Sequence, residues 1–291
     1  GSVTVINSTF INTTSNNGNG GAVHGDNVTV FDSIFINTKS TNYGGAIYTH
    51  NNIRNFTVSN SCFINTTSSV GGAIYAWNDG DFIVSNSSFI NTTSNNGNGG
   101  AIYTHINIRN FTVTDSTFTN TTAKGGGGAI YASNRGDFIV SNSSFINTTS
   151  SSNGGAIYSG GNIRNVTVTD STFTNTTSNN GNGGGAIYKT GSGGLTVINS
   201  TFTNTTACKD GGAIYQYGGS GVTVINSTFK DTTAATNGGA IYRSGRNVTV
   251  TNSKFTNNSA GSQGASIWTN DVLNVKDSTF NSPNANGTAI I

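Results

Sequence analysis

The sequence contains no glutamate and no methionine, and its 291 residues include only two leucines and one proline. Because several of the strongest helix formers are missing or scarce, long helices are excluded. Charged residues make up 8% of the chain and hydrophobic residues 33%, whereas an ordinary globular domain has roughly 25% and 45–50%. No apolar run reaches the roughly 18 residues that indicate a membrane span. A formal net charge of +2, spread along the chain, predicts no nucleic-acid partner.

Instead, the sequence repeats itself every 25 to 29 residues, and such a period indicates a solenoid rather than a disordered chain. A phenylalanine marks each unit, at Phe10, Phe35, Phe63, Phe89, Phe118, Phe145, Phe173, Phe202, Phe229, Phe255 and Phe280. A valine lies five residues before each of these phenylalanines, and a serine lies two residues before it. The eleven units account for residues 1–291, so we expect one solenoid domain without a linker.

Each unit contains three short segments in which β-branched or aromatic residues alternate with polar ones, a pattern typical of half-buried strands. One unit shows the first segment at residues 28–30, and another shows the second at 171–176; the third has the sequence Gly-Ala-Ile-Tyr. Three strands in such a unit predict one rung of an all-β, single-stranded parallel β-helix of about 11 rungs. We expect the phenylalanines and valines to point inward. By alternation, Ser8 and Asn12 should begin inward ladders beside Phe10.

An aromatic column follows the Gly-Gly-Ala-Ile segment. It consists of Tyr48, Tyr75, Tyr103, Tyr131, Tyr158, Tyr188, Tyr215, Tyr242 and Trp268. If the isoleucines point inward, this column forms an exposed stripe, and such a stripe indicates a contact surface for a glycan or a protein. The alternatives are that the tyrosines point inward or that turns cover their rings.

Charged residues recur just before the valine segment, with signs that alternate from unit to unit. They are Asp26, Arg54, Asp81, Arg109, Asp137 and Arg164. Because neighbouring rungs lie about 4.8 Å apart, we expect a ladder of alternating charges along one edge, with a structural rather than a catalytic role.

The two cysteines lie five rungs apart, beyond the roughly 7 Å between Cα atoms that a disulfide allows. We therefore expect free thiols or links between molecules, with Cys62 buried. Asn-x-Ser/Thr signals are frequent, as in a secreted glycoprotein. The best candidates for glycosylation directly precede the valine segment, at Asn27, Asn55, Asn110, Asn165 and Asn247.

The motifs at residues 199–204 (Asn-Ser-Thr-Phe-Thr-Asn) and 211–215 (Gly-Gly-Ala-Ile-Tyr) resemble repeats of the adhesin-like surface proteins of methanogenic archaea. They are also similar to the GGAI and FxxN repeats of chlamydial polymorphic membrane proteins, although here the asparagine usually follows the phenylalanine by two residues. The resemblance implies a right-handed β-helix with an extracellular, adhesive or structural role.

Two other functions of such folds find less support in the sequence. A polysaccharide-cleaving enzyme needs carboxylates clustered in one groove, whereas the aspartates here are dispersed, and we expect no enzyme, metal or cofactor. Ice binding needs an uninterrupted outward threonine row, and isoleucine replaces threonine at Ile83 and Ile139.

The sequence begins and ends within rungs, so we expect rods to stack head to tail into a fibre. The expected contact joins Val3, Thr4 and Val5 to Ala289, Ile290 and Ile291. The alternative is a monomeric rod, or a segment of a longer adhesin, that binds surface glycans or neighbouring cells through the tyrosines.

Overall fold

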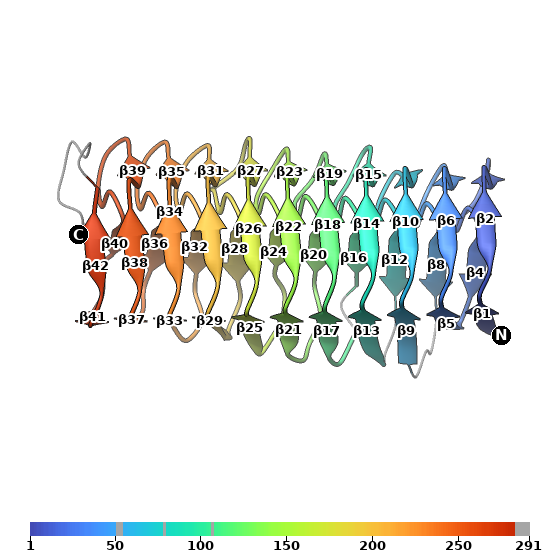
Figure 1. The fold of residues 1–291 in the computed structure, drawn as a ribbon, viewed down its shortest axis with the longest axis horizontal. Coiled ribbons are helices and arrows are strands. Elements are labelled where there is room, and N and C mark those ends of the chain that lie inside the picture. Colours follow the sequence, from blue (N-terminus) through green and yellow to red (C-terminus); the bar gives the residue numbers. More distant parts are fainter. Residues whose placement is uncertain (51–54, 78–79, 106–107, 283–291) are drawn as a thin grey trace.

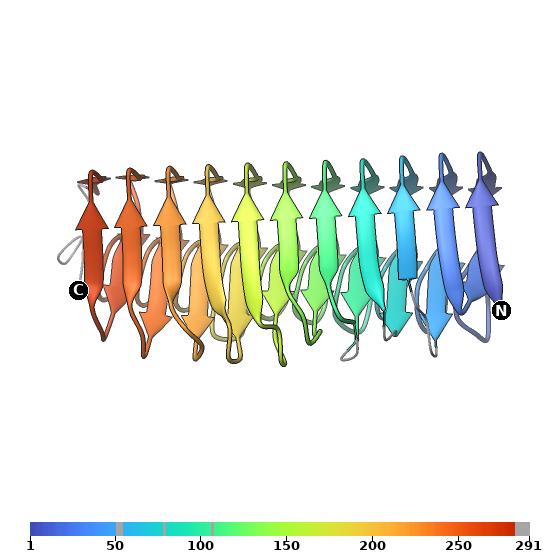
Figure 2. The same cartoon turned by 90° about the horizontal axis from the view of Figure 1, so that it is seen from below.

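The computed structural model describes residues 1–50, 55–77, 80–105 and 108–282. These residues form 42 strands and no helix. The strands wind into a rod whose two ends carry the first and the last of the described strands, and every sheet runs along the long axis (Figures 1 and 2). All pairings between strands are parallel and join one rung to the next, so the fold is the expected parallel β-helix.

The Val sheet contains the valine segments. It has 11 strands: β1 (Ser2–Ile6), β5 (Asn27–Phe31), β9 (Asn55–Ser59), β13 (Asp81–Ser85), β17 (Phe111–Thr114), β21 (Phe138–Ser141), β25 (Asn165–Thr169), β29 (Gly194–Ile198), β33 (Val222–Ile225), β37 (Val248–Thr251) and β41 (Leu273–Lys276). Its valines point inward as predicted; Val30, Val58 and Val84 are fully buried.

The Phe sheet contains the phenylalanine column. It has 11 strands: β2 (Thr9–Ile11), β6 (Ile34–Ile36), β10 (Cys62–Ile64), β14 (Ser88–Ile90), β18 (Thr117–Thr119), β22 (Ser144–Ile146), β26 (Thr172–Thr174), β30 (Thr201–Thr203), β34 (Thr228–Lys230), β38 (Lys254–Thr256) and β42 (Thr279–Asn281). The phenylalanines from Phe35 to Phe255 are fully buried, which confirms the inward column.

A third, short sheet was not expected from the sequence. It has 10 strands of two residues: β3 (Thr14–Ser15), β7 (Lys39–Ser40), β11 (Thr67–Ser68), β15 (Thr93–Ser94), β19 (Thr122–Ala123), β23 (Thr149–Ser150), β27 (Thr177–Ser178), β31 (Thr206–Ala207), β35 (Thr233–Ala234) and β39 (Ser259–Ala260). The prediction of three strands per rung was therefore wrong: the polar Asn-Thr-Thr segment leads into a fourth strand.

The Ile sheet closes each rung. It has 10 strands: β4 (Val23–Gly25), β8 (Ile47–His50), β12 (Ile74–Trp77), β16 (Ile102–Thr104), β20 (Ile130–Ala132), β24 (Ile157–Ser159), β28 (Ile187–Thr190), β32 (Ile214–Tyr217), β36 (Ile241–Ser244) and β40 (Ile267–Thr269). Two glycines precede it in most rungs. A Cβ on Gly45, the second of one such pair, would lie 2.1 Å from the Gly72 carbonyl oxygen, so the turn requires glycine there.

A serine ladder lies at the turn before the Phe sheet, and an asparagine ladder lies at the turn after it. The serine ladder points inward as predicted: the Ser33 hydroxyl donates to the Phe31 carbonyl at 2.7 Å, and the Ser33 amide donates to Ser61 Oγ at 3.2 Å. The asparagine ladder exists but faces solvent, which corrects the expectation that Asn12 points inward. Asn12 has φ 57°, and this left-handed residue interrupts the strand alternation on which that expectation relied.

Candidate functional site

The aromatic column lies outside the Ile sheet, opposite the buried isoleucines, and its rings stack from rung to rung. Ring centroids of neighbours from Tyr48 to Trp268 are 4.4–5.5 Å apart. Four members, Tyr48, Tyr75, Tyr188 and Tyr215, are only 5–7% exposed, and the other members are half-buried. Burial raises the pKa of Tyr75 above its usual range. The expected exposed stripe is thus corrected: because the rings cover one another, the column presents ring edges.

A second aromatic group follows the column at the end of the Ile sheet. Trp77, whose side chain is 38% exposed, lies between His50 and His105 on three successive rungs. Its ring centroid is 5.2 Å from that of His50 and 4.0 Å from that of His105. Burial lowers the pKa of His105. In the sequence, His50 and His105 are noticeable only because they recur two repeat units apart. Their distance along the sequence does not show that the ring of Trp77 lies between them.

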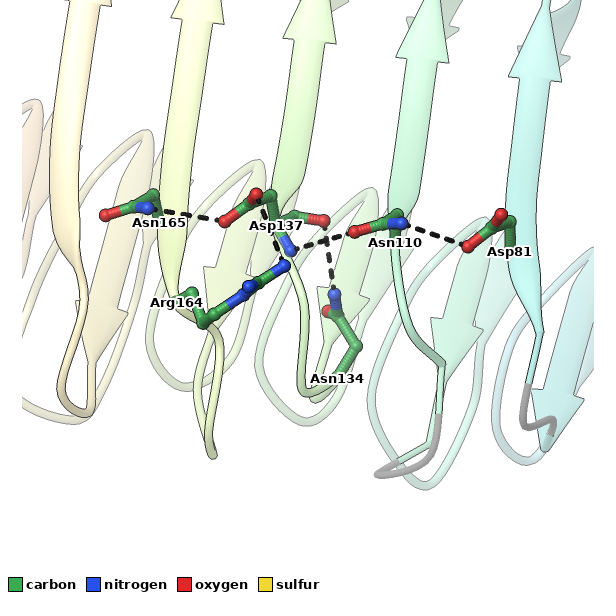
Figure 3. Close-up of polar contacts among 6 residues, drawn as sticks. All are labelled: Asp81, Asn110, Asn134, Asp137, Arg164 and Asn165. Atoms are coloured by element: carbon green, nitrogen blue, oxygen red, sulfur yellow. Dashed lines mark hydrogen bonds and ion pairs between the residues drawn. The ribbon is translucent and has the colours of Figure 1, made fainter.

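Of the charged residues that the sequence places on one edge, the described ones share the corner between the Ile and Val sheets, but they do not form the expected alternating ladder. They are Asp26, Asp81, Arg109, Asp137 and Arg164. Asp81 and Asp137 occupy the same column as the asparagines. Asn110 Nδ2 donates to Asp81 Oδ1 at 3.1 Å, and Asn165 Nδ2 donates to Asp137 Oδ1 at 3.3 Å (Figure 3). The corner therefore carries an amide–carboxylate ladder.

Only one of the expected ion pairs forms among the described residues of this ladder. Arg164 NH2 lies 3.7 Å from Asp137 Oδ2, and the Arg164 side chain is 67% exposed. Asp26 instead pairs with the amino group of Gly1. Arg54 lies outside the described residues. Alternation fails because Arg109 and Arg164 precede the strand column by one residue, whereas Asp81 and Asp137 lie in it.

Three arginines gather beside this ladder, and sequence reasoning missed one of them. Arg109, Arg135 and Arg164 line a shallow pocket of about 360 Å³ together with Asn110 and Gly136. Backbone bonds keep their rungs in register: the Arg135 amide donates to the Ile108 carbonyl, and the Arg164 amide to the Gly136 carbonyl, both at 3.0 Å. In the sequence, Arg109 and Arg164 belong to a pattern in which an arginine recurs in every second rung, and Arg135 does not belong to that pattern.

Three long polar side chains lie inside the rod, at the position that follows the tyrosine. Lys189, Gln216 and Arg243 are in register on successive strands of the Ile sheet and are fully buried. Lys189 Nζ donates to the Thr190 carbonyl at 2.7 Å, and Arg243 donates to the carbonyls of Ser244 and Gly219 at 2.6 and 3.1 Å. Sequence reasoning missed this row, because most other rungs have threonine, alanine or serine there.

The sequence model for the right handed beta helix region matches residues 105–280. The chain belongs to the right-handed β-helix family. Comparison with curated proteins gave no match, and comparison with solved structures gave none either.

The candidate glycosylation sites of this β-helix lie at the start of the Val sheet. Asn55, Asn110, Asn165 and Asn247 are exposed, and Asn27 is half-buried with its Nδ2 3.3 Å from Ser2 Oγ. All five therefore lie on the outer surface, although Asn110 and Asn165 already donate to aspartates.

Both cysteines of the β-helix are free and half-buried. Cys62 lies beside Phe63 but on the outward side of β10, with Sγ 3.2 Å from Ser88 Oγ, so the expectation that Cys62 is buried was wrong. Burial raises the pKa of Cys208, which keeps that thiol protonated at neutral pH.

Of the expected end contact, the first half is visible. Val3, Thr4 and Val5 lie in β1 and pair with β5. Ala289, Ile290 and Ile291 lie outside the described residues. Within the described ranges, no helix is long and apolar enough to cross a membrane. The same ranges bring no three metal-ligating side chains together.

Proposed function

We propose that this β-helix is an extracellular, adhesin-like structural rod of a cell surface, and that its role is non-catalytic. The observation that carries the proposal is the unbroken register of the rungs. The same valine, serine, phenylalanine and isoleucine columns pass from rung to rung, and each strand pairs only with its equivalents in the next rung.

This register suits a rigid spacer. The polar turns are tied to their neighbours by two kinds of ladder: buried serine bonds such as Ser87 amide to Ser116 Oγ at 3.2 Å, and exposed asparagine bonds such as Asn120 Nδ2 to Asn91 Oδ1 at 3.1 Å. Its outward residues are mostly threonine, serine and asparagine, which keep the rod hydrated. The exposed Asn-x-Thr signals support an extracellular location.

We further propose that the rods associate end to end. Because every rung repeats the same columns, a rung of a second copy can continue the ladders and ring stacks in the same register. Eleven rungs at about 4.8 Å give an expected axial repeat of about 50 Å.

Electron microscopy of the full chain tests this association, with two matched variants. Val3 is half-buried on the inward side of β1, and Thr4 is exposed on its outward side. Val3→Lys should abolish filaments by placing a charge in the joint, whereas Thr4→Lys should leave them intact. Separate short rods at every concentration in the unmodified chain would refute end-to-end association.

The alternative function, glycan binding through the tyrosines, draws support from the half-buried members of the column, three of which are consecutive in its middle. Tyr103, Tyr131 and Tyr158 are half-buried rather than buried, so their edges are accessible. Replacing these three with serine should abolish glycan binding under this alternative and leave filaments held only at their ends unchanged.

A further inference from the structure

The column of asparagines and aspartates at the start of the Val sheet is interrupted at two successive rungs. After Asn165 the column holds Gly194, then Gly221, and resumes at Asn247. A Cβ built on Gly194 would make only ordinary van der Waals contacts, the nearest at 3.5 Å from the Gly221 carbonyl oxygen, so the backbone leaves room for a side chain that is absent. The other glycine has φ 138°, a conformation that side chains rarely adopt.

This interruption forms a polar pocket of about 300 Å³. The outward threonines Thr196, Thr223 and Thr249 line one side, and Ser220 contributes a further hydroxyl. The residues around the pocket include no charged side chain. A neutral ligand rich in hydrogen-bonding groups therefore fits better than an ion.

The two ends of the pocket carry amide side chains that the ladder leaves incomplete. Asn165 donates its Nδ2 to Asp137, and its Oδ1 points away from that aspartate toward the gap (Figure 3). The position of a Cβ on Gly194 is 4.0 Å from this oxygen. At the other end, the side chain of Asn247 forms no hydrogen bond with any described residue. Elsewhere in the column, amides such as that of Asn110 continue the ladder to the preceding rung.

Buried side chains brace the same corner from inside the rod. Gln216 Nε2 donates to the carbonyls of Gly193 and Gly218, both at 3.3 Å, and Arg243 donates to that of Gly219 at 3.1 Å. These bonds hold the glycine-rich turns that replace bulkier corner residues such as Ile108 and Ile163. The pocket is thus a rigid hollow, which lowers the entropy cost of binding.

We propose that this pocket binds a neutral saccharide that carries acetamido groups. Asn165 and Asn247 lie three rungs apart, so the N–H of one acetamido group can donate to Asn165 Oδ1 while the carbonyl of a second accepts from the Asn247 amide. The two groups would take the place of the two missing amides of the ladder. The hydroxyls of Thr196, Thr223 and Ser220 match the sugar hydroxyls. This site is distinct from the tyrosine column and does not depend on end-to-end association.

The test uses the full chain made without glycosylation and two disaccharides that differ in the acetamido groups. Saturation-transfer NMR with N,N′-diacetylchitobiose should show contact at the acetamido methyls, and cellobiose should bind at least tenfold more weakly. Gly194→Asn restores the column residue, fills the pocket and should abolish the signal. Asn110→Ala, in the same column outside the pocket, should bind as the unmodified chain does.

Each result decides the proposal. Absence of binding by diacetylchitobiose, or binding that survives Gly194→Asn in a variant with an unchanged circular dichroism spectrum, overturns the site. Equal binding of the two disaccharides, lost in Gly194→Asn, overturns the acetamido specificity.

The acetamido sugar can come from a partner surface or from the chain itself, because residues 165–167 and 247–249 each form an Asn-Val-Thr signal beside the pocket. Peptide mass spectrometry of native material distinguishes the two sources. A glycan on Asn165 or Asn247 assigns the pocket to the chain's own sugar, and the absence of a glycan on both assigns it to a sugar of a partner surface.

Discussion

Phe35 stacks on Phe63 with ring centroids 4.7 Å apart and planes within 1°. The same arrangement continues on both sides, with Phe10 on one and Phe89 on the other. The spacing equals the strand separation of a parallel sheet, so backbone pairing and ring stacking reinforce one another. The column replaces the compact core of a globular domain, and a gap in it affects both neighbouring rungs.

Phe118→Ala should therefore destabilise the rod by about 3–5 kcal/mol, through lost burial and an unfilled cavity. Phe118 lies mid-column and stacks on Phe89 and Phe145, each at 4.8 Å. Chemical denaturation followed by circular dichroism measures the change. Thr117→Ala, at the exposed neighbour in β18, is the control and should change the free energy of unfolding little. Equal effects of the two substitutions would refute a core role for the column.

The asparagines at the turn after the Phe sheet have a left-handed backbone, and their side chains hydrogen-bond to the asparagine of the neighbouring rung. Two substitutions at Asn120 separate the contributions of the backbone and of the side chain to stability. Asn120 has φ 55° and donates to Asn91 Oδ1 at 3.1 Å. Asn120→Gly removes the amide but tolerates the backbone, whereas Asn120→Ala also strains it by about 1–2 kcal/mol. We expect the alanine variant to be the less stable of the two by that difference in thermal or chemical unfolding. A glycine variant as unstable as the alanine variant would show that the side-chain ladder dominates.

How far the sequence predicts this structure depends on whether the alternation of inward and outward side chains continues through each turn. Val, Ser and Phe positions were assigned correctly because each lies within a strand or next to one. The Asn12 prediction failed because a left-handed residue puts Ile11 and Asn12 on the outside in succession, so that the next residue turns inward. The same shift buries Thr38, and it hides the short strand Lys39–Ser40 inside what the sequence shows as a polar turn.

The surface sites were harder to predict, because they depend on which repeats depart from the consensus. In the sequence, Gly194 and Gly221 each lie in a glycine-rich turn. Only the pairing register of the strands shows that these two glycines take the place of asparagines. The sequence analysis assigned no position to Lys189 and Arg243, whose side chains point inward at the position after tyrosine. Charged residues are rarely fully buried without a partner, so composition argued against that placement.

A column of buried threonines offers a stabilising substitution. Thr121 is fully buried, and its Oγ1 has no hydrogen-bond partner among the described atoms. Valine has nearly the same shape without the hydroxyl, so Thr121→Val removes an unsatisfied polar group. We expect an increase in stability of about 1–2 kcal/mol, visible as a higher denaturation midpoint. Thr121→Ser, which keeps the hydroxyl and loses a methyl group, should instead lower it.

Lys189 gives the rod a dependence of stability on alkaline pH. Burial, with a smaller contribution from Arg243, lowers the pKa of Lys189 to about 8, whereas an unfolded chain has a lysine pKa of about 10.4. Between these values the unfolded chain binds more protons than the folded one, so stability rises with pH across that window and does not change with this group below it. The tyrosines act in the opposite direction above about pH 10, the pKa of an unfolded tyrosine, because burial raises the pKa of residues such as Tyr75 in the rod.

Unfolding free energies measured between pH 7 and pH 10 in the unmodified chain, Lys189→Met and Lys124→Met test this dependence. Lys189→Met should be more stable near neutral pH and should lose the rise with pH, because its side chain fills the same interior space without a charge. Lys124 is exposed, so Lys124→Met should retain the full slope. A slope that persists in Lys189→Met would assign the alkaline stabilisation to another group and would show that the interior lysine keeps its proton across this pH window.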